Sequence, residues 1–386
     1  MSYPSQSHSA ASPTSETWPV EDVAEHNAAA SERPTSTLQL SLEGLVEAGF
    51  PAAIGTRTSR EGGRESLAAG LADLASGQVA EPDRMVRMGS NAKMFTAVVV
   101  MQLVDEGRVE LDGTIEAQLP RLVSSEGADN SRVTVRQLLQ HTSGLPDYVQ
   151  ALLTDDSAFR RNTPPRDLLD LALTVPAVSG PGERWAYSNT NYLVLGMLIE
   201  HASGNSLEDE VTHRIIQPLK LERTFMPRGG DRQIPHPHLR GYHIDSGRVG
   251  LVDWTETDPS TSWGSGQIIS TPAELNIFMQ ALLLGELTSA DALQQMKKTV
   301  PADETFWPGM RYGLGLQRYP LSNGGTAWGH GGDFPGYQTR NAVNEDGTAV
   351  TISVTALPPA FIDPTDVPAL MQTYRRVTAA LNAALG

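Results

Sequence analysis

The chain has 386 residues, a formal net charge of −16 and no cysteine. The absence of cysteine excludes disulfides, thiol catalysis and metal centres with cysteine ligands, and the acidic balance argues against nucleic acid or an anionic membrane surface as a partner. The apolar content of 39% is that of a globular protein. Because the sequence lacks a run of ~20 apolar residues, we expect no membrane-spanning segment.

The first segment, residues 1–37, is rich in Ser, Ala, Pro, Thr and Glu. Such a composition buries too little apolar surface to fold, so we predict a disordered leader. The segment lacks the basic and apolar regions of a signal peptide. The chain as written is therefore expected in the cytoplasm, whereas a true start further upstream would indicate secretion.

After the leader, a short helix (40–48), two strands (52–58 and 66–72) and a buried helix (94–104) are predicted from apolar patterning. A Ser-x-x-Lys motif, Ser90 to Lys93, stands at the start of the buried helix. Three residues is nearly one helical turn, so the hydroxyl and the amine lie on one face.

The chemistry of this pair suits acyl transfer. Serine is a weak nucleophile until a neighbouring base takes its proton, and lysine is such a base only when uncharged, which burial and the positive end of a helix favour. Ser90 and Lys93 are therefore a candidate nucleophile and base. The alternative is that Ser90 is only a helix N-cap, a position that serine also favours.

The middle of the chain is predicted to be rich in helices. A capping box of Thr134 and Gln137 indicates a helix that ends near His141. In a loop that leads into another helix, Tyr187 offers a phenol that can relay a proton, and Asn189 offers an amide that can hold a carbonyl. The alternative is that the tripeptide Tyr187-Ser188-Asn189 forms only a turn. The other helices expected here cover 166–173 and follow Asn191 and Ser206.

The C-terminal third is predicted to return to strands. A Thr271 cap followed by Pro272 and Glu274 indicates a helix start. A glycine-rich strand then carries His330, and its glycines would let a ligand approach the backbone closely; a structural histidine is the alternative. The expected ranges are a helix to Gly285, hairpin-like antiparallel strands over 311–317, 326–330, 337–344 and 348–355, and a closing helix over 367–385.

These elements predict an α/β (α+β) fold with an antiparallel sheet flanked by helices, plus an all-helical domain. Residues 38–110 and 265–386 would form the sheet-and-helix domain, and residues 111–264 the helical domain. Ser90 and His330 would then come from the first domain and Tyr187 from the second, which places the candidate site in the cleft between them.

Taken together, the motifs Ser90-x-x-Lys93, Tyr187-x-Asn189 and His330-x-Gly332 resemble those of the serine penicillin-recognising family, which includes DD-peptidases and class C β-lactamases. The resemblance runs from about Gly44 to the C-terminus. It is greatest to the soluble D-alanyl-D-alanine carboxypeptidase/transpeptidase branch, which has a His-x-Gly third motif. The fold implied is that of the β-lactamases and DD-peptidases.

The resemblance implies a role for each matched residue. Ser90 would form the acyl-enzyme, and Lys93 and Tyr187 would shuttle protons. Asn189 would bind the substrate amide, and His330 would complete the proton and charge network where other members use lysine. The substrate-binding positions implied are Asn189, Trp263 as a cleft-wall aromatic, Gln317, Gly331, Gly332 and Asp333, with the backbone N–H groups of Ser90 and Asp333 as an oxyanion hole.

Three positions depart from the carboxypeptidase branch. Where that branch holds a terminal carboxylate with an arginine and two threonines, this chain has Gln317, Gly331 and Asp333. Asp333 is expected to repel a carboxylate and to tolerate an amine or a neutral group. In the alternative, Asp333 points to solvent and only its N–H matters.

The sequence thus predicts a serine acyl-enzyme hydrolase or acyltransferase for D-amino-acid peptide bonds or related amides and esters. An esterase, a D-aminopeptidase, and a thioesterase or peptide cyclase are alternatives within the same chemistry. A non-catalytic β-lactam-binding scaffold is the alternative outside it. We expect a small peptide, ester or β-lactam as the substrate, no cofactor, no metal and a monomer.

Overall fold

The structure, a computed structural model, describes five stretches of the chain: residues 36–123, 130–152, 155–245, 250–305 and 307–386. The predicted leader lies outside the described residues, apart from Ser36, which caps the first helix, and Thr37, which begins it. Within the described stretches, every helix is too short or too polar to cross a bilayer.

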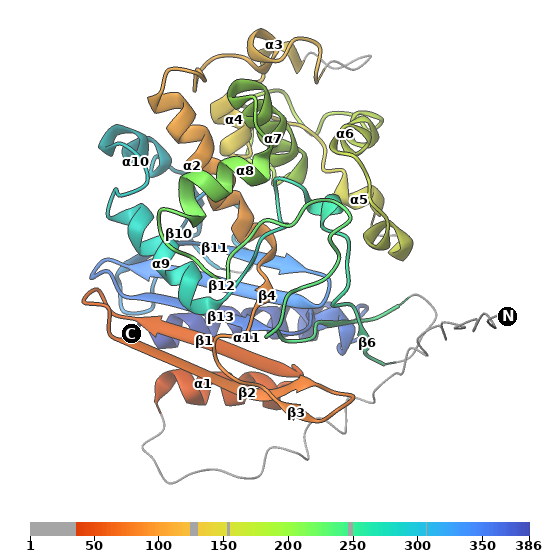
Figure 1. Cartoon of the computed structure of the whole chain (residues 1–386), viewed down its shortest axis with the longest axis vertical. Helices are drawn as coiled ribbons and strands as arrows, with labels where there is room; N and C mark the ends of the chain where they lie inside the picture. The colour runs from red at the N-terminus through yellow and green to blue at the C-terminus, as the bar shows by residue number, and fades with distance from the viewer. Residues whose placement is uncertain (1–35, 124–129, 153–154, 246–249, 306) are drawn as a thin grey trace, which may run out of the picture.

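An antiparallel sheet of nine strands, counted over the described residues, forms the lower half of the molecule (Figure 1). Both ends of the chain build it, because β1 pairs with β13 at its centre. In spatial order the strands are β3 (Gln78–Val79), β2 (Arg64–Asp73), β1 (Ala52–Thr58), β13 (Ala349–Val354), β12 (Tyr337–Asn344), β11 (Thr326–Phe334), β10 (Gln317–Pro320), β9 (Arg311–Tyr312) and β8 (Val300–Pro301).

Helices cover both faces of this sheet. The terminal helices α1 (Thr37–Glu47) and α11 (Val367–Leu385) pack on each other and share one apolar core with β1, β12 and β13. Helix α9 (Pro272–Leu283) belongs to the second core and covers the other face. It starts as predicted, with the Thr271 hydroxyl accepting a hydrogen bond from the Glu274 N–H. The predicted fold class is therefore confirmed.

The upper half of the molecule gathers the helices of the middle segment (Figure 1). Helix α2 (Ala92–Asp105) packs against α7 (Asn189–Ser203). Almost every residue of α2 is buried, which explains its nearly continuous apolar sequence. The remaining helices are α3 (Ile115–Gln118), α4 (Val135–Leu139), α5 (Val149–Leu152), α6 (Pro165–Leu173), α8 (Leu207–Val211) and α10 (Ala290–Met296).

The structure differs from two expectations. The segment predicted as one strand over 311–317 is instead a hairpin: β9 and β10 pair antiparallel with Tyr312 opposite Gln317, and the chain reverses in a turn where the Gly313 N–H donates to the Leu316 carbonyl at 2.7 Å. The middle segment is also not all helical. Its described residues beyond 216 include the paired strands β5 (Tyr242–His243) and β6 (Val252–Asp253).

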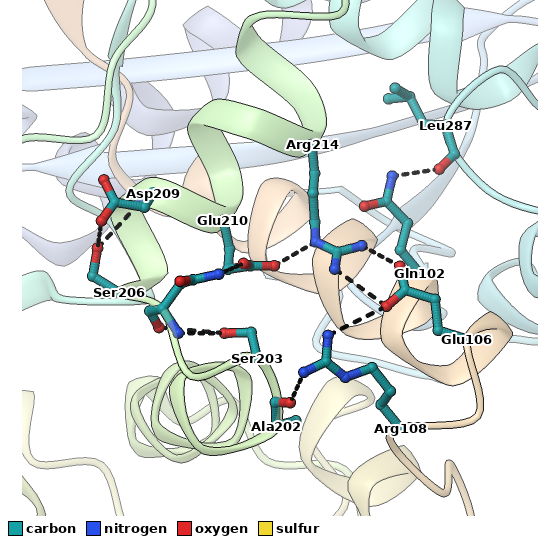
Figure 2. Close-up of polar contacts among 11 residues, drawn as sticks. Gln102, Glu106, Arg108, Ala202, Ser203, Ser206, Asp209, Glu210, Arg214 and Leu287 are labelled. Carbon is teal, nitrogen blue, oxygen red and sulfur yellow. Dashed lines mark hydrogen bonds and ion pairs between the residues drawn. The ribbon is translucent and has the colours of Figure 1, made fainter.

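An ion-pair network ties the end of α2 to the turn that follows α8 (Figure 2). The Arg214 guanidinium lies between two carboxylates, that of Glu106 and that of Glu210. The Glu210 side chain is 6% exposed and Arg214 is 20% exposed. Glu106 also meets Arg108 at 3.8 Å, but there both side chains are about 40% exposed. Since water screens exposed pairs, we expect Arg214 to carry most of the stability of this network.

Arg214→Ala should lower the free energy of unfolding by about 2 kcal/mol, because it leaves the buried Glu210 carboxylate without its ion pair. Arg108→Ala removes the exposed partner of Glu106 and should cost less than about 1 kcal/mol. Urea unfolding followed by circular dichroism measures both. Equal losses in the two variants would contradict the assignment.

Candidate active site

Ser90 lies in a short 3₁₀ turn, Gly89–Asn91, directly before α2. The turn packs tightly on strand β11. Gly89 has φ +51°, and a Cβ there would lie 2.7 Å from the Asp333 carbonyl oxygen. A residue with a side chain would therefore clash, so glycine is what allows Ser90 to sit against the strand.

The Lys93 amine contacts the Ser90 hydroxyl. Its side chain is fully buried, and Nζ donates to Ser90 Oγ at 3.1 Å, Asn189 Oδ1 at 2.7 Å and the Ser265 carbonyl at 2.9 Å. Burial lowers the Lys93 pKa to about 7, against the opposing effect of the Asp147 carboxylate. Near neutral pH a large fraction of the amine is thus uncharged and able to take the Ser90 proton.

The Asn189 amide, at the start of α7, is held from both ends. Its oxygen accepts from Lys93, and its Nδ2 donates to Asp147 Oδ2 at 3.0 Å. Burial raises the pKa of Asp147, which faces this network from the loop before α5. Sequence reasoning missed Asp147. The sequence offers no local signal for it, because Asp147 lies 42 positions before Asn189 and outside the three motifs.

The Tyr187 ring completes the wall around Lys93. Lys93 Nζ lies 4.9 Å from the ring centroid, and the nearby Ser90 hydroxyl partly opposes the rise in the Tyr187 pKa. Burial holds the Tyr187 pKa well above its ordinary value, so the phenol is a proton donor at neutral pH. His141 stacks on the ring at 4.3 Å and accepts from the Ser188 N–H at 3.2 Å, which fixes the loop.

His330 lies buried on β11 with both ring nitrogens occupied. Its Nε2 contacts the Tyr312 hydroxyl at 2.8 Å, and its Nδ1 contacts the Gly331 carbonyl. Because a carbonyl only accepts, Nδ1 carries the proton and the tyrosine donates to Nε2. Burial, with the Lys93 charge, lowers the His330 pKa to about 3. The imidazole is therefore neutral, and its part in the proton and charge network stays a prediction.

The two backbone N–H groups of the predicted oxyanion hole lie on facing segments. In the Ser90 turn, the first N–H that donates to a carbonyl of the turn is that of Asn91, which bonds the Met88 carbonyl. The Ser90 N–H comes one residue earlier and has no acceptor within the turn. On β11, the Gly331 N–H points away from β12 and donates to Gln317. Strand alternation gives the Asp333 N–H the same direction, beside Gly89. Their role stays a prediction.

A cavity of about 360 Å³ opens over Ser90. Its lining includes the polar residues Ser90, Tyr187, Asn189 and His330 together with several aromatic and apolar side chains. Gln317, Gly331 and Asp333 also line it, as the sequence predicts. The remaining lining residues are Trp185, Asp303, Trp307, Met310, Tyr319, Arg340 and Thr378.

Two predicted substrate-binding residues do not line this cavity. Trp263 is only 5% exposed, donates to Glu208 at 2.9 Å and packs on Gly196 in the helical core. Gly332 faces the Ser90 turn, where a Cβ would lie 2.0 Å from the Met88 carbonyl oxygen. Neighbouring strand residues point to opposite faces, so Gly331 and Asp333 share one face of β11, while Gly332 shares the other with His330, whose ring still reaches the cavity.

Asp333 does not present the unpaired charge that the sequence suggested. Its carboxylate forms an ion pair with Arg340, at 2.6 Å between Oδ1 and Nη1. The Arg340 side chain, on β12, is 8% exposed. Sequence reasoning missed Arg340. The register of the hairpin sets it opposite Gly331, and the Pro335-Gly336 turn was the signal for that register.

Comparisons with known proteins identify the family and the fold of the chain. The profile of the Beta-lactamase family matches residues 57–375. The crystal structure of a D-stereospecific amidohydrolase from Streptomyces sp. is 34% identical, covers 84% of this chain and 95% of its own, and superposes with a TM-score of 0.77. The D-amino acid amidase of Ochrobactrum anthropi SV3, at 24% identity, shares the fold over 90% of this chain and 97% of its own, with a TM-score of 0.78.

A curated relative, penicillin-binding protein 4* of Bacillus subtilis, is 28% identical over 282 residues. The match covers 70% of this chain and 60% of that longer protein. The family match spans most of the chain, including all three motifs. The fold of the Streptomyces amidohydrolase agrees over 84% of the chain. The chain therefore belongs to the beta-lactamase family of serine hydrolases.

Proposed function

We propose that this chain hydrolyses amide bonds on the carbonyl side of D-amino-acid residues through an acyl-enzyme on Ser90. The observation that carries the proposal is the contact of 3.1 Å between Lys93 Nζ and Ser90 Oγ, made by an amine whose pKa is about 7. A serine beside a buried, half-deprotonated lysine at the bottom of a cavity is an activated nucleophile.

In the proposed reaction, neutral Lys93 takes the hydroxyl proton as Ser90 Oγ attacks the amide carbon. The N–H groups of Ser90 and Asp333 stabilise the oxyanion. The neutral Tyr187 phenol, near the Ser90 hydroxyl, is placed to pass a proton to the leaving nitrogen. When the C–N bond breaks, the amine departs and Ser90 holds the acyl group as an ester. The proton on Lys93 then replaces the one that Tyr187 gave up. Water attacks the ester, Lys93 takes one of its protons and passes it to Ser90 Oγ, and the acid is released with Ser90 restored.

The substrate class rests on the similarity to the Streptomyces amidohydrolase and on the cavity itself. Gln317 and Gly331 offer no positive charge to a terminal carboxylate, and the guanidinium nearest to them is already paired with Asp333. This favours substrates with a neutral leaving group, such as a D-amino-acid amide or ester, over strict carboxypeptidase action. A D-aminopeptidase uses the same chemistry. The predicted monomer and the predicted cytoplasmic location stay predictions.

The test is turnover of D-phenylalanine amide and L-phenylalanine amide, with ammonia release as the readout. We expect the D-amide to be hydrolysed at least about 100-fold faster in kcat/KM, because the acyl group must fit one wall of a fixed site. Equal turnover of both would overturn the stereochemical part of the proposal. If neither turns over, intact-protein mass after incubation with a fluorescent penicillin decides between a slow acyl-enzyme and a silent site.

A further inference from the structure

The ion pair between Asp333 and Arg340 lines the same cavity that opens over Ser90. Residues 331 and 333 share one face of β11 and line the cavity, and Arg340 stands opposite residue 331 on β12. Gly331 leaves room for the guanidinium: a Cβ there would lie 3.2 Å from Arg340 Nη1. The arginine therefore lies over the strand and reaches Asp333 two residues further on.

The pair is built as a carboxylate-binding site that is already filled. Arg340 donates to both carboxylate oxygens of Asp333, at 2.6 and 3.4 Å, and Nη1 also donates to the Thr339 carbonyl at 2.9 Å. Such a fork is the geometry by which arginine binds a free carboxylate. The arginine is almost fully buried, but its partner is 37% exposed and open to the cavity. An internal carboxylate thus stands where a substrate carboxylate would bind.

We propose that Asp333 masks Arg340, so that this pair makes the site select amides and esters over substrates that end in a free carboxylate. The inference rests on the proposed function, because it concerns the leaving-group side of the same reaction. It assigns a specificity role to Arg340. The carboxypeptidase branch carries its carboxylate-binding arginine at a different position, which is Gln317 in this chain. A bound carboxylate would have to compete with Asp333 for the guanidinium and would face its negative charge.

The test compares an N-acylated D-Ala-D-Ala dipeptide with its C-terminal amide, as the ratio of the two kcat/KM values. Asp333→Asn keeps the size of the side chain and unmasks the guanidinium, so the ratio should rise toward the free carboxylate by at least about tenfold. Arg340→Gln leaves Asp333 unpaired in the cavity, so the ratio should fall below that of the wild type. The double variant, which carries neither charge, should return close to the wild-type ratio.

Two outcomes overturn the inference. If both single variants lower turnover of the two substrates in parallel, the pair is only structural. If the ratio rises equally in Asp333→Asn and in the double variant, the gain comes from lost repulsion and not from an exposed arginine. The same comparison is made by equilibrium binding of both dipeptides in a Ser90→Ala background. A failed turnover assay then counts against the proposed function alone, and the binding ratio still decides this inference.

Discussion

Ser90→Ala is expected to abolish acyl-enzyme formation and to lower kcat/KM for D-amino-acid amides by about 10⁴- to 10⁶-fold. The loss should be this large because the variant retains the cavity and the oxyanion donors but has no nucleophile. Thermal stability should change little, since Ser90 is only half-buried and the substitution removes a single oxygen.

Intact-protein mass after incubation with an activated ester of a D-amino-acid peptide measures acylation, and ammonia release measures turnover. Ser41→Ala is the matched control, because Ser41 is likewise half-buried, lies on α1 away from the cavity, and its hydroxyl donates to the Thr37 carbonyl. The control should acylate as the wild type does. An adduct on Ser90→Ala, or turnover above about 1% of wild type, would show that another residue is the nucleophile.

Lys93→Met should lower kcat/KM by about 10³- to 10⁴-fold, because it removes the base while filling nearly the same buried volume. In the wild type, activity should rise with pH through about 7, since the amine must lose its proton before it can take one from Ser90. The direction follows from the sign of the shift: below the lowered pKa Lys93 is charged and inactive, and above it Lys93 is neutral and active. The variant should lose this dependence.

Lys297→Met is the matched control for the pH profile. Lys297 is partly buried beside Trp328, and burial lowers its pKa as well, but it lies outside the cavity lining. Its removal should leave both the rate and the rise near pH 7 in place. If the rise persists in Lys93→Met or vanishes in Lys297→Met, Lys93 is not the group that titrates.

The sequence was sufficient for the features that depend on neighbours along the chain. The cap of α9 and the capping box at Thr134 appear as predicted, because each is decided within four residues. The three motifs also predicted which side chains would surround Ser90, and the structure brings Lys93, Tyr187 and Asn189 to it. These contacts could be predicted only because the motifs resemble those of a known family.

The features that were missed depend on which segments meet in space. Arg340 joins the cavity through hairpin register, and Asp147 reaches Asn189 from a loop 42 positions earlier. Trp263 was placed in the cleft by alignment, but its side chain turns into the helical core and pairs with Glu208. The direction of a side chain from an irregular loop is set by packing partners that no local pattern contains.

The pairing of β1 with β13 has a consequence for biosynthesis. Ala52 donates its backbone N–H to the Thr355 hydroxyl, across 303 positions of sequence, at the centre of the sheet. The segment that carries the nucleophile is therefore synthesised well before β11 and β12, which supply Gly331, Asp333 and Arg340 to the cavity. Long-range closure of this kind slows folding. A nascent chain therefore carries Ser90 and Lys93 without a complete cavity around them until these strands have emerged and paired.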